Sequence, residues 1–228
     1  MMALRWILLV VLTAGAAQGQ ERRVISVTGV GAVDVAPDMA TITTGVQTAD
    51  RRANEAMRAN SALMASVMKV LQAEGIAARD VQTTGLSLFP RYDNNSASQG
   101  VRVAQYIAQN NITVRVRDLD RVGAVLDAMN QAGINQINGI SFGLQNSETA
   151  MNIARKNAVT DGQEKAMLYA TAAGVALGPL QSLSEPGASQ PAPRPMAMAR
   201  AESMAMGVPI SEGELTLRAR VNLVYAID

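Results

Sequence analysis

The sequence predicts an α+β fold in which mainly antiparallel sheets carry three packed helices. Segments with apolar residues at every second position alternate along the chain with segments of helical period. Several strand-like segments follow one another without a helix between them, which favours antiparallel pairing. With 228 residues, of which 48% are hydrophobic, the chain is long enough to bury a core without disulfides. The strands can divide into two sub-sheets around a shared core.

The first two strands are predicted from alternation. Apolar residues or glycines occupy the odd positions from Ile25 to Val35, and Pro37 ends this strand because it cannot donate to a ladder. Alternation then continues through 40–46, and the short connection at 36–38 predicts a hairpin between the two strands.

A glycine pair in the first strand resembles the beginning of a dinucleotide-binding fingerprint. Gly29 and Gly31 lack the third glycine and the following helix that such a phosphate site needs. We therefore interpret the two glycines as a bulge or a close approach of another backbone.

The next segments predict a helix followed by two strands. Asp50 is expected to cap a helix that ends near Glu74. A strand from Val81 to Phe89 follows, closed by Pro90, and the polar residues 93–100 form a loop or hairpin tip before a strand over Val101–Arg117.

Two more helices complete the pattern. One runs from its cap Asp118 to Gly133, and the other runs from about Ser147 to Ala173, with small alanines that allow close packing on a sheet. A short strand, Ile137–Leu144, separates them, and a long strand over 215–227 closes the chain. All three helices end at a glycine followed by a branched aliphatic residue, namely Gly75-Ile76, Gly133-Ile134 and Gly174-Val175.

The composition excludes several classes of chemistry. The chain has no His and no Cys, so Ser-His-Asp triads, thiol nucleophiles, structural zinc sites and disulfides are excluded. A formal net charge of +1 argues against binding to nucleic acid. Carboxylates remain, but the pairs Asp34/Asp38 and Glu212/Glu214 are typical of turns. A carboxylate-dependent hydrolase is therefore the weaker alternative to a non-enzymatic protein.

The N-terminus has the features of a secretory signal over residues 1–19. Arg5 precedes a run of seven apolar residues from Trp6 to Leu12, and Ala17-Gln18-Gly19 fits cleavage before Gln20. We expect an exported mature protein, 20–228, that forms one domain.

A Pro- and Met-rich insertion is expected at about 186–209, where apolar periodicity is absent. Met196, Met198, Met204 and Met206 form two Met-x-Met units, whose soft thioethers could bind Cu(I). The alternative is that these methionines adapt to a neighbouring apolar surface. We expect no cofactor.

Four arginines are candidate interaction residues. Arg115, Arg117, Arg218 and Arg220 lie on the polar faces of two predicted strands, and they would share one sheet face if those strands were neighbours. Such a row is most often solvated, with acidic residues such as Asp80 neutralising it, but it can also attract an anion or a neighbouring subunit.

Several strings, in their order along the chain, resemble the SIMPL-domain family of bacterial envelope proteins, of the periplasmic immunogenic and oxidative-stress defence type. They are Val27-Thr28-Gly29-Val30-Gly31, Val33, Val35, Pro37-Asp38, Asn60, Gly75-Ile76, Asp80-Val81-Gln82-Thr83, Leu88-Phe89-Pro90-Arg91-Tyr92, Tyr106, Asn110, Val116-Arg117-Asp118-Leu119, Ile140-Ser141-Phe142, Arg155, Ala158, Lys165-Ala166 and Pro209-Ile210-Ser211-Glu212-Gly213-Glu214. The resemblance covers essentially the whole mature chain. It implies a periplasmic protein that can associate with the outer membrane and that forms homo-oligomers. It also implies a stress-protective role, and it supplies no catalytic motif.

Overall fold

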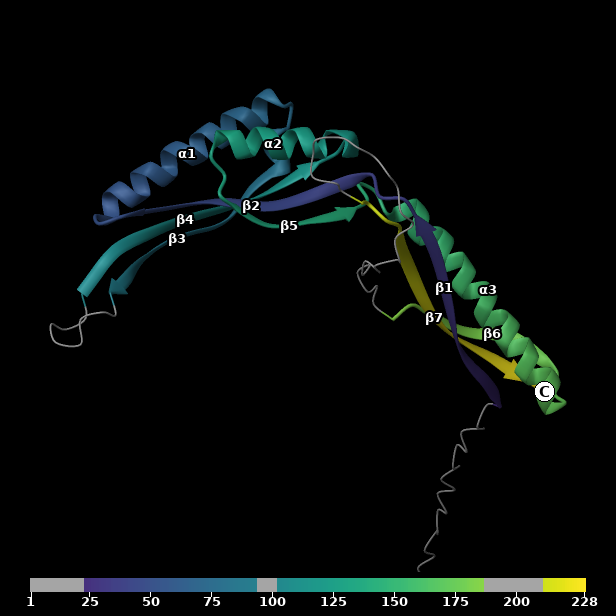
Figure 1. Ribbon diagram of the computed structural model, residues 1–228. Coiled ribbons are helices and arrows are strands. Elements are labelled where there is room, and N and C mark those ends of the chain that lie inside the picture. The colour runs from purple at the N-terminus through teal and green to yellow at the C-terminus, as the bar shows by residue number, and fades with distance from the viewer. Residues whose placement is uncertain (1–22, 94–101, 187–210) are drawn as a thin grey trace, which may run out of the picture.

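A computed structural model describes residues 23–93, 102–186 and 211–228 (Figure 1). These residues form two antiparallel sheets and three α-helices, which confirms the predicted α+β fold. In chain order the elements are β1 (Val24–Val35), β2 (Met39–Asp50), α1 (Ala53–Ala73), the 3₁₀ helix η1 (Ala78–Asp80), β3 (Val81–Asp93), β4 (Arg102–Val116), the 3₁₀ helix η2 (Leu119–Arg121), α2 (Val122–Ala132), β5 (Gln136–Gly143), α3 (Glu148–Ala173), β6 (Leu177–Ser184) and β7 (Leu215–Ile227).

The two sheets follow one another along an arch, and the helices lie on its outer side (Figure 1). One sheet has the strand order β3-β4-β2-β5 and is covered by α1 and α2, and the other has the order β1-β7-β6 and is covered by α3. The two predicted sub-sheets are therefore present. The expected shared core is wrong, because the buried clusters of the two sheets have no residue in common.

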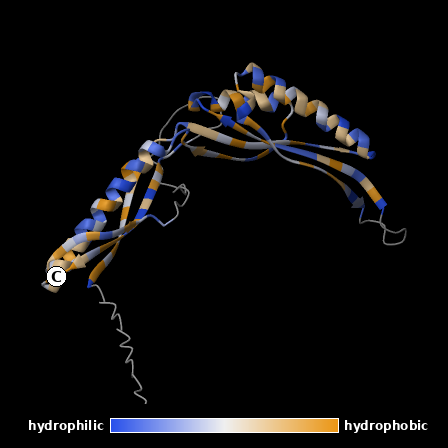
Figure 2. Cartoon of the chain, turned by 180° about the vertical axis from the view of Figure 1, so that it is seen from behind, coloured by the Kyte–Doolittle hydropathy of each residue, from blue (hydrophilic) through white to orange (hydrophobic). Residues whose placement is uncertain are grey.

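The core of the four-stranded sheet is built from aliphatic side chains and methionines. Its strands alternate in hydropathy (Figure 2), so that one face turns toward the helices. The buried residues are Ala40, Ile42, Val46, Met64, Val67, Leu71, Ile112, Val114, Val116, Val122, Val125, Leu126, Met129 and Ile134. One buried polar side chain, Asn60 of α1, donates to the carbonyl oxygens of Val46 (2.8 Å) and Ala108 (3.1 Å), and so joins α1 to both central strands.

The core of the three-stranded sheet is thinner because α3 approaches it through its smallest residues. Ala154, Ala158, Gly162 and Ala166 recur at intervals of four and are buried against β1 and β7. A Cβ atom on Gly29 would collide with the carbonyl oxygen of Ala158. The predicted close approach of backbone at the glycine pair is confirmed, and the approaching element is α3.

The predicted hairpin between the first two strands is wrong. β1 pairs with β7, from Val24 opposite Ala226 to Val35 opposite Leu215, whereas β2 pairs with β4 and β5. The chain crosses from one sheet to the other at Pro37 and Asp38. This crossing is fixed by hydrogen bonds from Asp38 N to Gly143 O (3.0 Å) and from Gln145 N to Asp38 Oδ1 (2.7 Å).

The three helices end at the glycines that the sequence predicts. Gly75, Gly133 and Gly174 have positive φ, and the branched residue after each glycine donates its N–H to the carbonyl oxygen five residues earlier. These are Schellman caps, in which a glycine relieves the strain of the left-handed conformation. All three helix ends have the same cap geometry, which explains why a glycine followed by a branched aliphatic residue recurs in the sequence.

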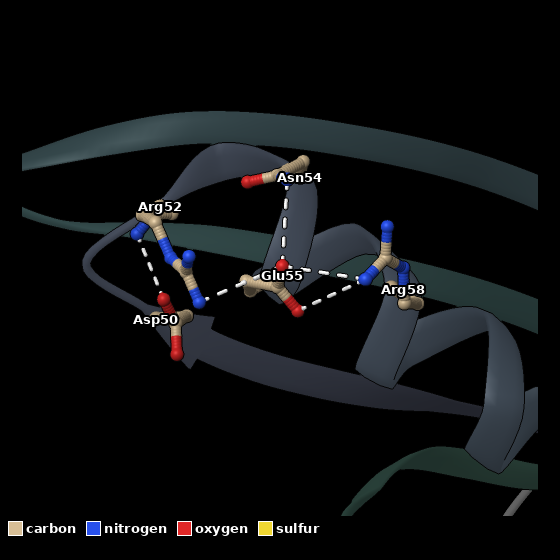
Figure 3. Close-up of polar contacts among 5 residues, drawn as sticks. All are labelled: Asp50, Arg52, Asn54, Glu55 and Arg58. Atoms are coloured by element: carbon tan, nitrogen blue, oxygen red, sulfur yellow. Dashed lines mark hydrogen bonds and ion pairs between the residues drawn. The ribbon is translucent and has the colours of Figure 1, made fainter.

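Two predicted boundaries are corrected. β3 continues through Pro90 to Asp93, because a proline is tolerated on an edge strand whose outward N–H has no partner. The cap residue of α1 is Arg52, while the Asp50 carboxylate accepts from Arg52 N at 2.8 Å. Figure 3 shows this turn, where Glu55 lies between Arg52 and Arg58 and faces both guanidinium groups.

Candidate functional site

The four candidate arginines do not share one face. β4 and β7 belong to different sheets, so Arg218 and Arg220 lie on the three-stranded sheet, and Arg115 and Arg117 lie at the end of the four-stranded sheet. The condition for a row of four cations is therefore not met. Of the four arginines, Arg115 on β4 and Arg117 directly after β4 are the two that lie near further charged residues in a cavity.

Arg115 and Arg117 line a cavity of about 220 Å³ at one end of the four-stranded sheet. The turn from α1 to β3 and the turn from β4 to α2 meet there. The lining residues are Gly75, Ile76, Ala77, Arg79, Asp80, Arg115, Val116, Arg117, Asp118 and Arg121. Sequence reasoning missed Arg79 and Arg121, because only the tertiary structure brings η1 and η2 together.

A bidentate ion pair lies among the residues that line this cavity. Arg117 Nη2 lies 2.6 Å from Asp80 Oδ1 and Arg117 Nε lies 2.8 Å from Asp80 Oδ2, while Arg117 Nη1 donates to Gln145 Oε1 at 3.2 Å. Asp80 is buried, with 5% of its surface exposed. The hydrogen bonds from Arg117 lower the pKa of Asp80 against the opposing effect of desolvation, and they raise the pKa of Arg117. The expectation that Asp80 neutralises an arginine is confirmed for Arg117.

The other cations of the cavity differ in their partners. Arg121 Nη2 pairs with Glu74 Oε2 at 2.9 Å. Neither Arg79 nor Arg115 makes an ion pair or a side-chain hydrogen bond with any residue of the described ranges, although the charges of both lower the pKa of Asp80. The cavity therefore holds two guanidinium groups with free donors.

The outer edge of β1 is closed by α3. Asp161 Oδ2 accepts from Val30 N at 2.7 Å, and on either side of it Asn157 Nδ2 donates to Ala32 O (3.1 Å) and Lys165 Nζ donates to Thr28 O (3.2 Å). Lys165 also pairs with Asp161 at 2.6 Å. Hydrogen bonds from Lys165 and from Val30 N lower the pKa of Asp161, so this carboxylate is held in its charged form.

Among the described residues, nothing covers the outer edge of β3 over 81–92. This strand has 13 residues and lies at the end of its sheet. Across the described ranges, no side chain is hydrogen-bonded to the main chain of residues 81–92. Large apolar residues are exposed along the strand and its partner, namely Leu86 (60%), Leu88 (40%), Phe89 (43%), Tyr92 (52%) and Val103 (41%). An open edge with apolar side chains is a template for pairing with another strand.

Of the four carboxylates predicted to lie at turns, Asp38, Glu212 and Glu214 lie in connections, whereas Asp34 lies within β1 opposite Thr216. Asp34 accepts from Thr216 Oγ1 at 2.6 Å, and Asp38 accepts from Gln145 N, as described above. Glu212 and Glu214 border Gly213, which has positive φ. In the described part of the chain, no group of three or more acidic side chains is placed to hold a metal ion.

Two further predictions lie outside the described residues. The signal segment 1–19 and the four methionines of the insertion, Met196, Met198, Met204 and Met206, fall in ranges for which no structure is given. Of the helices that the structure does describe, none combines the length and apolar character needed to span a membrane.

Comparison with known proteins identifies the family. The family model named SIMPL, a protein of unknown function (DUF541), matches residues 25–225. The 26 kDa periplasmic immunogenic protein of Brucella melitensis is 36% identical over 211 residues, which are 89% of this chain and 84% of that protein. The uncharacterized protein YggE of Escherichia coli K12 is 28% identical over 159 residues, or 70% of this chain and 64% of that protein. The periplasmic relative supports an exported or periplasmic location, and the chain belongs to the SIMPL family.

Proposed function

We propose that this chain is a non-enzymatic protein of the cell envelope that assembles with copies of itself through the open edge of β3. The observation that carries the proposal is the contrast between two edge strands of similar length. α3 caps β1 with three side chains, whereas no side chain of the described ranges caps residues 81–92 of β3, which carry exposed apolar residues. Monomeric proteins usually protect such an edge, so its exposure favours a strand partner.

The other two outer strands are poorer candidates for pairing. β5 has eight residues and a register shift at Thr43/Thr44 of its partner, and β6 has eight residues and two register shifts. Short and irregular edges resist the addition of another strand. A second copy is the favoured partner because one self-complementary patch is sufficient for a two-fold interface.

The absence of enzymatic activity is supported by the chemistry of the cavity. A general acid at neutral pH needs a raised carboxyl pKa, whereas Arg117 lowers the pKa of Asp80. The other carboxylate that lines this cavity, Asp118, is exposed and accepts a hydrogen bond from Asp120 N. The Cu(I) alternative depends on the four methionines alone and stays a prediction.

Self-assembly is tested by multi-angle light scattering of the mature chain, 20–228, at micromolar concentration. We expect an oligomer, and we expect L86K/L88K to dissociate it because two charges on the edge oppose strand pairing. Leu168→Lys on α3 is the matched control, since that leucine is 63% exposed but lies away from β3. A monomeric wild type, or an L86K/L88K variant that assembles normally, would contradict the proposal.

A protective role under oxidative stress is the further part of the proposal, and it is supported by the family resemblance. We expect a deletion strain to lose viability under peroxide. Expression of the wild-type chain should restore survival, and expression of L86K/L88K should not if protection depends on assembly. Equal survival of the deletion and parent strains would contradict this role.

A further inference from the structure

We propose that the arginine cavity between η1 and η2 binds a phosphate group. Arg79 of η1 and Arg115 near the end of β4 are far apart in sequence but line the same cavity, and both lie close enough to Asp80 to lower its pKa. Because neither guanidinium has a partner in the described structure, their donors are free for a ligand. Each guanidinium offers a planar set of N–H donors that matches the oxygens of a phosphate.

The Asp80–Arg117 pair in the lining of the cavity is held in place by several hydrogen bonds. Arg117 uses Nε and Nη2 on Asp80 and Nη1 on Gln145, so its position is fixed and its donors are largely occupied. The Asp80–Arg117 pair therefore serves as a structural support, and Arg79 and Arg115 would bind the ligand. Arg121 is partly available, because the only partner of its guanidinium in the described residues is Glu74, through Nη2.

The charge of the cavity favours an anion. Four arginines and two aspartates line it, which gives a formal charge of +2, and Glu74, which pairs with Arg121, lowers this charge to +1. The like charges of Arg79 and Arg115 repel each other, and a bound anion removes that cost. A volume of about 220 Å³ accommodates a phosphate and a small part of the group that carries it. A carboxylate is less well matched, because its two oxygens offer fewer acceptors to two separate guanidinium groups than the oxygens of a phosphate.

The site differs from the strings on which the family resemblance rests. Asp80 and Arg117 lie within those strings, whereas Arg79, Arg115 and Arg121 lie outside them. The supporting ion pair therefore belongs to the residues on which the resemblance rests, and Arg79 and Arg115 do not. The proposal is independent of assembly through β3.

Binding is tested by isothermal titration calorimetry, in which inorganic phosphate is added to the mature chain at constant ionic strength. We expect saturable binding that R79Q and R115Q each weaken by about tenfold, the loss of one charge-assisted hydrogen bond, and that the double variant abolishes. Arg218→Gln is the matched control, because Arg218 is exposed on the other sheet. Both cavity variants should fold normally, since neither side chain has a partner in the described structure.

A second arm distinguishes a free phosphate from a lipid headgroup. Vesicles of phosphatidylcholine with phosphatidic acid are compared with vesicles of phosphatidylcholine alone, whose phosphate carries a choline. Co-sedimentation that requires phosphatidic acid, Arg79 and Arg115 identifies a membrane headgroup. Phosphate binding without co-sedimentation identifies a soluble phosphate compound. Absence of phosphate binding, or binding that R79Q/R115Q leaves unchanged, would overturn the proposal.

Discussion

β1 and β3 are both long edge strands, with 12 and 13 residues, but they differ in whether a helix of the described structure covers their outer edge. α3 lies directly against β1, so that Asn157, Asp161 and Lys165 reach its outward backbone groups. α1 packs mainly against β2 and β4, the two central strands, and of β3 the first residue, Val81, packs against the core that α1 covers. The difference shows that the edge of a sheet is closed only where a helix can approach it closely.

The close approach of α3 depends on small residues. Gly29 and Gly31 on β1 lie against a helix stripe of alanines and Gly162, and this lets polar side chains on the flank of α3 extend over the edge. The helices on the four-stranded sheet use larger residues such as Met64, Leu71 and Met129, which hold them farther from the strands. The small residues between α3 and β1 thus allow α3 to cover the edge of β1, whereas the larger residues under α1 and α2 do not bring a helix over the edge of β3.

The largest expected effect comes from removing the close approach. Gly29→Ala places a Cβ against the Ala158 carbonyl oxygen, so α3 must move away from β1. We expect a loss of about 3 kcal/mol in the free energy of unfolding, the upper range for overpacking, measured by urea denaturation. Gly123→Ala is the control, because no atom lies within 4 Å of its added Cβ and alanine favours helix. Equal stability of the two variants would refute the packing account.

A smaller effect is expected at the base of β3. Asp80→Asn removes the ion pair with Arg117, and we expect a loss of about 2 kcal/mol in the free energy of unfolding at pH 7, as for a hydrogen bond to a charged group. Because folding lowers the pKa of Asp80, this stabilisation is present above the unfolded pKa of about 3.9 and is lost as the pH falls through the folded pKa. Urea denaturation from pH 7 to pH 3 should therefore show the two proteins converging in acid. A constant difference across that range would exclude this origin.

The smallest effect on stability is expected from opening the edge of β1. Asp161→Ala removes the acceptor of Val30 N and the partner of Lys165, and we expect a loss of about 1 kcal/mol. The same variant should form larger assemblies in light scattering, since a second edge is exposed. Asp127→Ala on α2 controls for the loss of an exposed carboxylate. Unchanged assembly of Asp161→Ala would show that its hydrogen bonds do not protect the edge.

Local features of the fold could be predicted from the sequence. Alternation identified β1, β4 and β7, and the glycines at 75, 133 and 174 identified the helix ends, because both signals depend on neighbouring residues. The pairing of strands could not be predicted in the same way. The chain around Pro37 has the pattern of a hairpin, and only the distant partners β7 and β5 show that it connects two sheets.

The candidate site could be predicted only in part. Arg115 and Arg117 were identified from the polar face of one strand, but Arg79 and Arg121 belong to two short turns with no motif. Their significance depends on which carboxylates reach which guanidinium groups. That assignment is a property of the tertiary structure, since Asp80 and Arg117 are 37 residues apart.

Hydrogen exchange followed by mass spectrometry tests most directly whether the β3 edge, and not the β1 edge, is available for pairing. Peptides covering 81–93 and 24–35 are compared in the mature chain across a range of protein concentrations. We predict that protection of the β3 peptide rises with concentration as copies pair, while protection of the β1 peptide stays constant. Concentration-dependent protection of β1, or none in β3, would contradict the account.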